Sequence, residues 1–183
     1  MQQENTFTDG NILIRPFSAE DINPLYEAVR ESINEVSPWL PWCHPDYKLE
    51  ETTEFIMSRD EAWKNDTDYG FGIFDAKTGK FLGGVGLSQV NRIHGMANLG
   101  YWVRTSCAGR GVASSAARLA ARFALEELKL HRVEILAATG NQASQRVAEK
   151  TGAVREGMLR KRLLVKGQAQ DAVLYSLIKE DFS

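Results

Sequence analysis

Two glycines near the middle of the chain, Gly109 and Gly111, lie between a segment with strand character and a segment with helix character. Because glycine lacks a Cβ, the backbone around it can turn so that successive N–H groups point toward one site. When a helix begins directly after such a loop, its unpaired N–H groups and its dipole favour a bound anion. The sequence therefore predicts an anion site at this loop, with a flexible strand-to-helix turn as the alternative interpretation.

The segments on either side of the loop have clear periodicities. Residues 98–103 alternate in character with the two-residue period of a strand, and they are rich in aromatic and β-branched side chains. Residues 114–128 are predicted as a helix with a face of small residues that could lie close to a sheet. Residues 131–137 form the next predicted strand. A strand, helix and strand in this order predict a crossover unit, whose two strands are parallel.

The rest of the chain predicts an otherwise antiparallel sheet with further helices. The expected elements are a strand at 11–17, a helix that starts with a capping box at 18–21, a helix at 49–63, a β-hairpin of 69–74 and 81–87, a helix at 142–150 that ends at Gly152, and strands at 153–159 and 172–178. The glycines at 83–86 are better explained by a bulge or close packing than by a phosphate loop, since no helix follows them. The predicted fold class is mixed α+β.

Three prolines keep residues 37–45, Ser-Pro-Trp-Leu-Pro-Trp-Cys-His-Pro, from forming a regular helix. This segment is therefore predicted to be a loop. Its two tryptophans could form the wall of a substrate pocket or could cover one side of the core.

Composition and charge limit the classes of function. The chain has 183 residues, 43% of them apolar and 25% charged, which predicts one globular domain at 1–183. Residues 1–90 carry 16 acidic and 7 basic side chains, whereas residues 91–183 carry 8 and 15. The basic half suits a ligand with phosphates, but a net charge of −2 makes nucleic acid an unexpected main partner.

The sequence lacks the features that mark membrane proteins, secreted proteins and metal-binding proteins. No apolar run approaches the roughly 20 residues that span a bilayer, and the first residues do not resemble a secretion signal, so we expect a cytoplasmic protein with no membrane partner. Cys43 and Cys107 lie far apart and are expected to be free thiols. Their spacing does not predict a metal site.

Six short segments occur together in a characteristic order. They are Pro38-Trp-Leu-Pro-Trp42, Gly-Tyr-Trp-Val at 100–103, Gly-Arg-Gly-Val-Ala at 109–113, Asn141-Gln-Ala-Ser144, Glu149-Lys-Thr-Gly-Ala153 and Glu156-Gly157. In these segments the chain resembles the GNAT superfamily of N-acetyltransferases, and within it the branch of the ribosomal-protein acetyltransferases RimJ and RimL. The resemblance spans nearly the whole chain and implies the GNAT fold, in which the parallel strand pair is splayed and helices cover both faces of the sheet.

The resemblance implies that acetyl-coenzyme A lies in a V between the strand ending at Val103 and the strand ending at Ala137. The pantetheine amides would pair with the backbone of Trp102 and Val103, and the pyrophosphate would rest on the N–H groups of the glycine loop. The implied cofactor-binding residues are Trp102, Val103, Gly109, Arg110, Gly111, Val112, Ala113, Ser114 and Asn141. No metal is implied.

Acyl transfer from a thioester to an amine needs a neutral amine, donors for the oxyanion, and a proton for the departing thiolate. In the implied site, the Val103 N–H is the candidate oxyanion donor and Ser144 the candidate acid. Asn141 could hold the pantetheine arm. The alternative for Asn141 and Ser144 is that they start and stabilise the N-terminus of a helix.

The chain departs from the family pattern at two positions. Ala108 stands where the family usually has Gln or Arg, and Asn98 stands where many relatives have Glu. Because an asparagine cannot act as a base, the base is left open between a relayed water, His94 and a carboxylate such as Glu35. The basic run 160–162, Arg-Lys-Arg, could approach the 3′-phosphate, although facing water is the favoured interpretation.

The expected function is transfer of an acetyl group from acetyl-CoA to a primary amine, with the α-amine of a protein or peptide N-terminus as the expected acceptor. An α-amine with a pKa of about 7.7–8.0 is partly neutral near pH 7, whereas a lysine-type amine at about 10.4 is almost wholly charged. A weak or relayed base could therefore suffice. The alternatives are a small-molecule amine acetyltransferase and a non-catalytic acyl-CoA-binding sensor. Monomer and homodimer both remain open.

Overall fold

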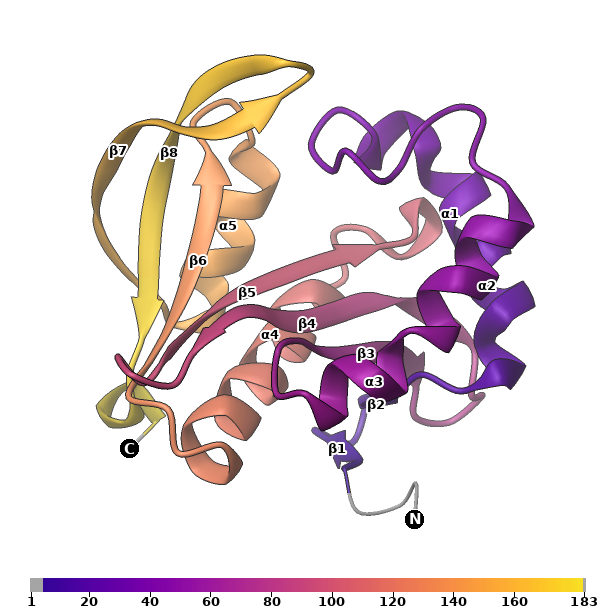
Figure 1. Ribbon diagram of the computed structural model, residues 1–183, viewed down its shortest axis with the longest axis horizontal. Helices are drawn as coiled ribbons and strands as arrows, with labels where there is room; N and C mark the ends of the chain where they lie inside the picture. Colours follow the sequence, from indigo (N-terminus) through magenta and orange to yellow (C-terminus); the bar gives the residue numbers. More distant parts are fainter. Residues whose placement is uncertain (1–4, 183) are drawn as a thin grey trace.

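The computed structural model describes residues 5–182, and one eight-stranded sheet runs through them (Figure 1). The strands are β1 (Phe7–Thr8), β2 (Ile12–Pro16), β3 (Tyr69–Asp75), β4 (Phe81–Asn91), β5 (Met96–Val103), β6 (Arg132–Ala138), β7 (Val154–Val165) and β8 (Gln168–Leu177). They lie in the order β1-β2-β3-β4-β5-β6-β8-β7. Every neighbouring pair is antiparallel except β5 and β6, which are parallel. The predicted mixed class is confirmed.

Within residues 5–182, five α-helices pack around this sheet. They are α1 (Ile22–Val36), α2 (Leu49–Met57), α3 (Arg59–Lys64), α4 (Val112–Arg122) and α5 (Gln142–Thr151). The predicted small-residue face of α4 is confirmed, because its alanines at 113, 116, 117, 120 and 121 are buried against the sheet. A second buried cluster joins α1, through Leu25 and Val29, to Phe74 and Phe81 at the turn between β3 and β4. Within the described residues, no helix is long and apolar enough to cross a membrane.

The helix predicted at 49–63 is wrong as a single element, because α2 and α3 are separated at Ser58. The Ser58 hydroxyl donates to the Phe55 carbonyl at 2.7 Å, a local bond of the kind by which serine competes with regular helix hydrogen bonding. The helix predicted at 114–128 begins earlier, at Val112, and its last part, Phe123–Glu127, is a π-helical turn.

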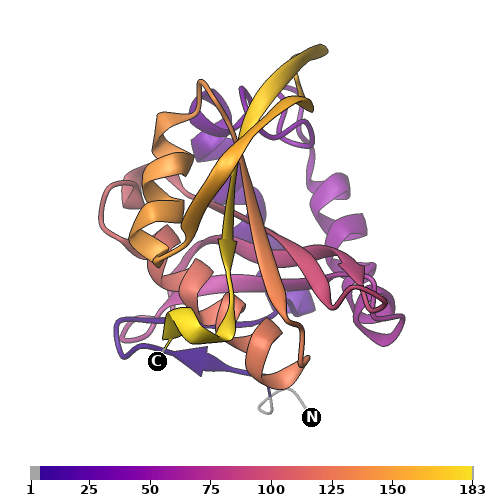
Figure 2. The same cartoon turned by 90° about the vertical axis from the view of Figure 1, so that its left-hand side faces the viewer.

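The last two strands are longer than predicted and form a hairpin that extends beyond the rest of the sheet (Figure 2). β7 continues for six residues past the predicted end at Leu159. The first three of these added residues, 160–162, are charged and exposed, so no alternation of polar and apolar side chains marked the segment as strand. The short strand β1 was not predicted either.

The glycines of β4 serve close packing, as predicted. A Cβ placed on Gly83 would lie 2.2 Å from the Trp102 carbonyl oxygen, so only glycine fits at this crossing of β4 and β5. This close approach helps to fix where the end of β5 lies.

Candidate active site

The parallel strands β5 and β6 stay paired over only three positions. Their partners run from Met96 with Arg132 to Asn98 with Glu134, and beyond these residues the two strands diverge (Figure 1). A cleft of about 620 Å³ lies here, lined by β5, β6, the start of α4, α5, the loop after α1 and the end of β7. The predicted splayed pair is therefore confirmed.

One backbone edge of β5 faces this cleft. The Arg104 N–H donates to the Leu82 carbonyl at 2.9 Å, and facing residues of an antiparallel ladder alternate between bonded and non-bonded pairs. Trp102 lies two positions earlier on the same ladder, so its N–H and C=O face β4. The backbone groups of Tyr101 and Val103 therefore face the cleft. The expected pair of open backbone positions, Trp102 and Val103, is corrected to Tyr101 and Val103.

The glycine loop forms one end of the cleft. Gly109 and Gly111 have φ angles of +77° and +82°, in the left-handed region that favours glycine. The Ser115 N–H bonds to the Gly111 carbonyl at 3.0 Å, so the N–H groups just before Ser115 have no partner one turn earlier. The loop and helix residues that line the cleft are Gly109, Gly111, Val112, Ala113 and Ser114. Arg110 is exposed and is not part of the lining.

Two basic residues of α5, Arg146 and Lys150, also line the cleft. They lie one helical turn apart, and in the described part of the chain neither side chain has a hydrogen bond or an ion pair. Neither residue was predicted from the sequence, although their four-residue spacing places them on one face of the helix predicted at 142–150.

Helix α1 holds the segment that leads from β5 into the loop. The Glu31 carboxylate accepts hydrogen bonds from the Arg104 guanidinium and from the Ser106 N–H at 2.9 Å. The Thr105 N–H donates to the Ser32 hydroxyl at 3.0 Å. The Arg104 hydrogen bonds, aided by those of Ser106, lower the pKa of Glu31 from 4.5 to about 2. The glycine loop is thus anchored to α1 by charged contacts.

Asn141 and Ser144 both line the cleft at the start of α5. The Asn141 side-chain oxygen accepts the Ser144 N–H at 3.0 Å, which is a helix N-cap. The N-cap contact of the alternative interpretation is therefore present in the structure. It leaves the Ser144 hydroxyl and the Asn141 side-chain nitrogen available for other contacts.

Tyr101 reaches from β5 across to α5 and contacts Ser144. Its hydroxyl donates to the Ser144 carbonyl at 2.9 Å and lies 3.1 Å from the Ser144 hydroxyl. Burial raises the pKa of Tyr101 to about 12, despite the opposing hydrogen bond with Ser144. Tyr101 is consequently a neutral hydrogen-bond donor at physiological pH. This contact could not be predicted from the sequence, since only the fold brings β5 and α5 together here.

Three side chains bear on the identity of the base that takes the proton of the amine. Asn98 lines the cleft, and its side-chain oxygen is buried without a hydrogen-bond partner in the described structure. Glu35 also lines the cleft, where its carboxylate accepts the Thr105 hydroxyl at 2.9 Å. His94 is exposed and lies outside the lining. The structure therefore places Asn98 and Glu35 at the cleft, and His94 away from it.

The proline-rich segment at 37–45 is a loop, as predicted, and Trp39, Leu40 and Pro41 line the cleft. The Trp39 ring lies 3.5 Å from where a Cβ on Gly140 would be, so this loop reaches toward the turn between β6 and α5. Trp42 packs against the Trp102 ring, with centroids 5.5 Å apart. Trp39 and Trp102 thus form an aromatic wall of the cleft, whereas Trp42 packs on Trp102 without lining the cleft.

The end of β7 forms the facing side, through Arg162, Leu163, Leu164 and Val165. Cys107 lines the cleft as well, and both it and Cys43 are buried free thiols. The described residues hold no group of three or more His, Cys, Asp or Glu side chains placed to bind a metal.

Comparison with known proteins assigns this architecture to a family. The family model described as an acetyltransferase (GNAT) domain matches residues 11–154. The chain is 31% identical over 175 residues to YdaF of Bacillus subtilis, a protein named for ribosomal N-acetyl transfer, covering 94% of this chain and 93% of YdaF. It is 23% identical over 157 residues to the ribosomal-protein-serine acetyltransferase of Escherichia coli, covering 86% of this chain and 87% of that protein.

A solved structure shares the fold. It is RimL, a ribosomal L7/L12 α-N-protein acetyltransferase in complex with coenzyme A, with a TM-score of 0.83 and 20% identity over 92% of this chain and 94% of that chain. The family match covers most of the chain, and the mixed sheet has the splayed parallel pair expected of it. This chain therefore belongs to the GNAT family of acetyltransferases.

Proposed function

We propose that this chain transfers the acetyl group of acetyl-CoA to the α-amine of a protein or peptide N-terminus. The observation that carries the proposal is the cleft itself. One end has the unpaired N–H groups of the glycine loop, and its middle has the open backbone edge of Tyr101 and Val103. The names of the relatives, which refer to ribosomal-protein acetylation, support a polypeptide acceptor.

The residues at the loop fit a ligand that carries phosphates. A Cβ on Gly109 or Gly111 would meet nothing within 4 Å, so the loop offers open space in front of its N–H groups. A helix N-terminus favours an anion there, and Arg146 and Lys150 add positive charge. We assign the pyrophosphate to the loop and the pantetheine amides to the backbone of Tyr101 and the carbonyl of Val103, which leaves the Val103 N–H for the reacting thioester. Arg110 can contribute a charge from outside the lining.

When bound, acetyl-CoA supplies a reactive thioester. The Val103 N–H faces the cleft and is suited to donate to the oxygen that gains negative charge as the amine attacks. The Ser144 hydroxyl is suited to give a proton to the departing thiolate. Tyr101 holds Ser144 through two contacts, and Asn141 fixes the first turn of the helix that carries it. We retain Val103 and Ser144 as the proposed catalytic groups.

On the acceptor side, we assign the buried Asn98 oxygen to an N–H of the incoming amine. A buried acceptor without a partner is costly, so a ligand that donates to it gains the bond and removes that cost. Asn98 cannot take the proton. An α-amine, part of which is neutral near pH 7 because its pKa is about 7.7–8.0, needs less help from a base than a lysine does. Water, with Glu35 nearby, completes the proposed route for the proton.

The proposal is tested by comparing kcat/KM values for N-terminal peptides, spermidine and an aminoglycoside, with acetyl-CoA as the donor. We expect a clear preference for peptides, and mass spectrometry should locate the acetyl group on the α-amine. A preference for either small amine would contradict the proposal. Acetyl-CoA binding without turnover of any amine would instead support the acyl-CoA sensor. A ribosomal or nascent acceptor would place the reaction in the cytoplasm.

A further inference from the structure

The β7–β8 hairpin contains a bulge of basic residues. Leu159 pairs with Ala172 and Leu163 pairs with Gln170, so the three residues 160–162 face a single residue, Asp171, on β8. We call Arg160, Lys161 and Arg162 the basic bulge. Extra residues of this kind re-aim side chains out of the regular pattern of a strand.

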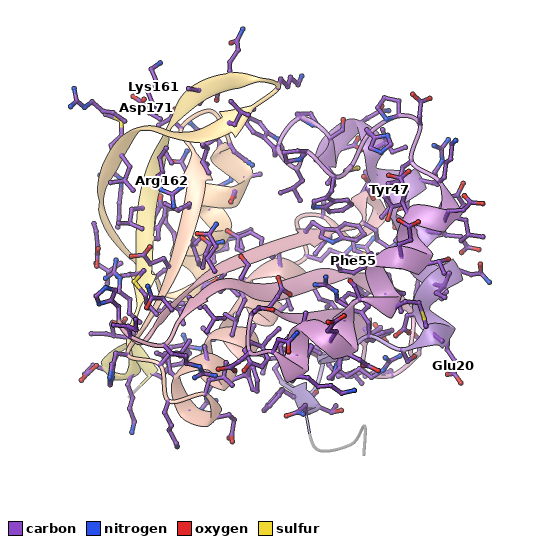
Figure 3. All side chains as sticks on the ribbon, viewed as in Figure 1. Glu20, Tyr47, Phe55, Lys161, Arg162 and Asp171 are labelled. Atoms are coloured by element: carbon purple, nitrogen blue, oxygen red, sulfur yellow. The ribbon has the colours of Figure 1, made fainter. Side chains whose placement is uncertain are left out.

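The basic bulge is a built feature of the hairpin. Lys161 has a φ angle of +51°, in the left-handed region, and its N–H donates to the Asp171 carboxylate at 2.9 Å. Its ammonium group also donates to the Ala169 carbonyl at 3.3 Å. Two contacts across the hairpin thus occupy Lys161 and fix the backbone between the two arginines. Figure 3 shows Lys161, Arg162 and Asp171 gathered on this hairpin.

The two arginines of the basic bulge, in contrast, have no hydrogen bond or ion pair with any residue between 5 and 182. Both are exposed. Other arginines of the protein are paired, as Arg132 is with Glu156 at 2.6 Å and Arg15 with Asp21 at 2.7 Å. A guanidinium binds a carboxylate through two parallel hydrogen bonds, so the free pair can bind carboxylates from outside the chain.

The basic bulge lies where an acceptor polypeptide would leave the cleft. Arg162 lines the cleft together with Leu164, which is 65% exposed. The opposite side is formed by Trp39 and Pro41 of the 37–45 loop. A chain whose N-terminus lies near Asn98 would therefore pass between this loop and the hairpin.

We propose that the basic bulge binds acidic side chains that follow the N-terminal residue of the acceptor polypeptide. This inference rests on the proposed function and names its substrate class. Within the cleft, Glu35 suits the cationic terminus, while Arg160 and Arg162 suit carboxylates farther along the chain. This arrangement of charge would favour acceptors with an acidic N-terminal segment. A nucleic-acid surface is less well supported, because tight binding of DNA or RNA commonly involves about 6–10 phosphate contacts.

The test uses two peptides with identical first residues, one continuing with aspartates and the other with asparagines. Because an exposed charge pair contributes about 0.2–1 kcal/mol, two such pairs predict that the wild-type protein prefers the acidic peptide by roughly 2- to 30-fold in kcat/KM, mainly through KM. In the double variant Arg160→Gln/Arg162→Gln, we expect kcat/KM for the acidic peptide to fall to the value for the neutral peptide. The neutral peptide should be acetylated as before.

The matched control is Lys77→Gln/Lys80→Gln, which removes two exposed charges from the turn between β3 and β4 and should keep the preference. Equal kcat/KM values for the two peptides in the wild-type protein would overturn the inference, as would a preference that survives the double substitution. Stronger inhibition by an RNA oligonucleotide than by an acidic peptide would assign the basic bulge to nucleic acid instead. Acetylation of the neutral peptide tests the proposed N-terminal acetylation independently of the basic bulge.

Discussion

The contact between Tyr101 and Ser144 gives the serine a defined orientation. The Ser144 carbonyl oxygen can only accept a hydrogen bond, so the Tyr101 hydroxyl proton points toward it across the 2.9 Å contact. The Tyr101 oxygen can then accept from the Ser144 hydroxyl, 3.1 Å away. If the serine proton moves to a departing thiolate, the tyrosine proton can instead support the serine oxygen. Tyr101 is therefore a positioning residue for the proposed acid.

Substitution of Tyr101 by Phe should lower kcat about 2- to 12-fold, because a hydrogen bond contributes about 0.5–1.5 kcal/mol. Ser144→Ala should lower kcat by about 100- to 10,000-fold, the range typical of a general acid. Acetyl-CoA affinity, measured by calorimetry, should change little in either variant. Since Tyr101 acts through Ser144, the double variant should be no slower than Ser144→Ala alone.

Tyr175→Phe is the matched control, because its hydroxyl contacts Glu149 at 3.3 Å and Tyr175 does not line the cleft. Losses that multiply in the Tyr101→Phe/Ser144→Ala variant would show that the tyrosine acts independently. An unchanged kcat in Ser144→Ala, where chemistry limits the rate, would remove Ser144 from the mechanism.

At the scale of elements, the unit of β5, α4 and β6 could be predicted from the sequence. Its strands have a two-residue period, and the buried alanines of α4 recur at helical spacing. A crossover helix then requires the two strands to be parallel. The glycine loop followed from the same reasoning, because Gly109 and Gly111 lie at the junction of strand and helix.

Features that depend on contacts between distant segments could not be predicted. The register of β4 against β5 determines that the backbone N–H and C=O groups of Tyr101, and not those of Trp102, face the cleft. The basic bulge depends on a change of pairing between β7 and β8, which local sequence does not specify. The partnerless oxygen of Asn98 appears only when its surroundings are known.

Gly111→Glu tests the loop at the N-terminus of α4. The substitution places bulk and negative charge at the helix end where we assign the pyrophosphate, so the Kd for acetyl-CoA should rise on the order of 10-fold or more. The left-handed φ at Gly111 also predicts a loss of about 1–2 kcal/mol of stability. Calorimetry with acetyl-CoA measures the first effect, and thermal unfolding measures the second.

Gly79→Glu is the control for backbone strain. Gly79 lies in the turn between β3 and β4 with a φ angle of +71°, and a Cβ there would meet nothing within 4 Å, as at Gly111. Its glutamate variant should lose similar stability but keep its affinity for acetyl-CoA. Equal affinities in the two variants would mean that the pyrophosphate lies elsewhere.

At the scale of the whole molecule, two ion pairs connect segments on either side of the β5–β6 junction. On one side, Glu31 of α1 binds the Arg104 guanidinium at the end of β5. On the other, the Glu156 carboxylate of β7 accepts two hydrogen bonds from Arg132 of β6, at 2.7 and 2.6 Å. Each pair joins segments that are far apart in the sequence. Protonation of these carboxylates would therefore weaken both of these long-range contacts.

The lowered pKa values of Glu31 and Glu156 predict that acid destabilises the fold. The Arg104 contact lowers the pKa of Glu31 from 4.5 to about 2, and the Arg132 contact does the same for Glu156. A group with a lowered pKa in the folded state stabilises the fold fully above its unfolded pKa, because the unfolded chain binds protons first as the pH falls. The free energy of unfolding should therefore decrease between about pH 4.5 and about pH 2.

Glu31→Gln should lower stability at neutral pH and make this acid decrease shallower, so that its curve meets the wild-type curve near pH 2. Urea unfolding at a series of pH values measures both effects at constant ionic strength. Salt should reduce the difference, since the Glu31 side chain is 30% exposed and its charge is partly screened. Glu54→Gln removes the same charge from α2, where the carboxylate has no ion pair among the described residues, and should leave the acid slope unchanged. Parallel wild-type and Glu31→Gln curves from neutral pH to pH 2 would show that the Arg104 contact does not hold α1 to the cofactor loop in solution.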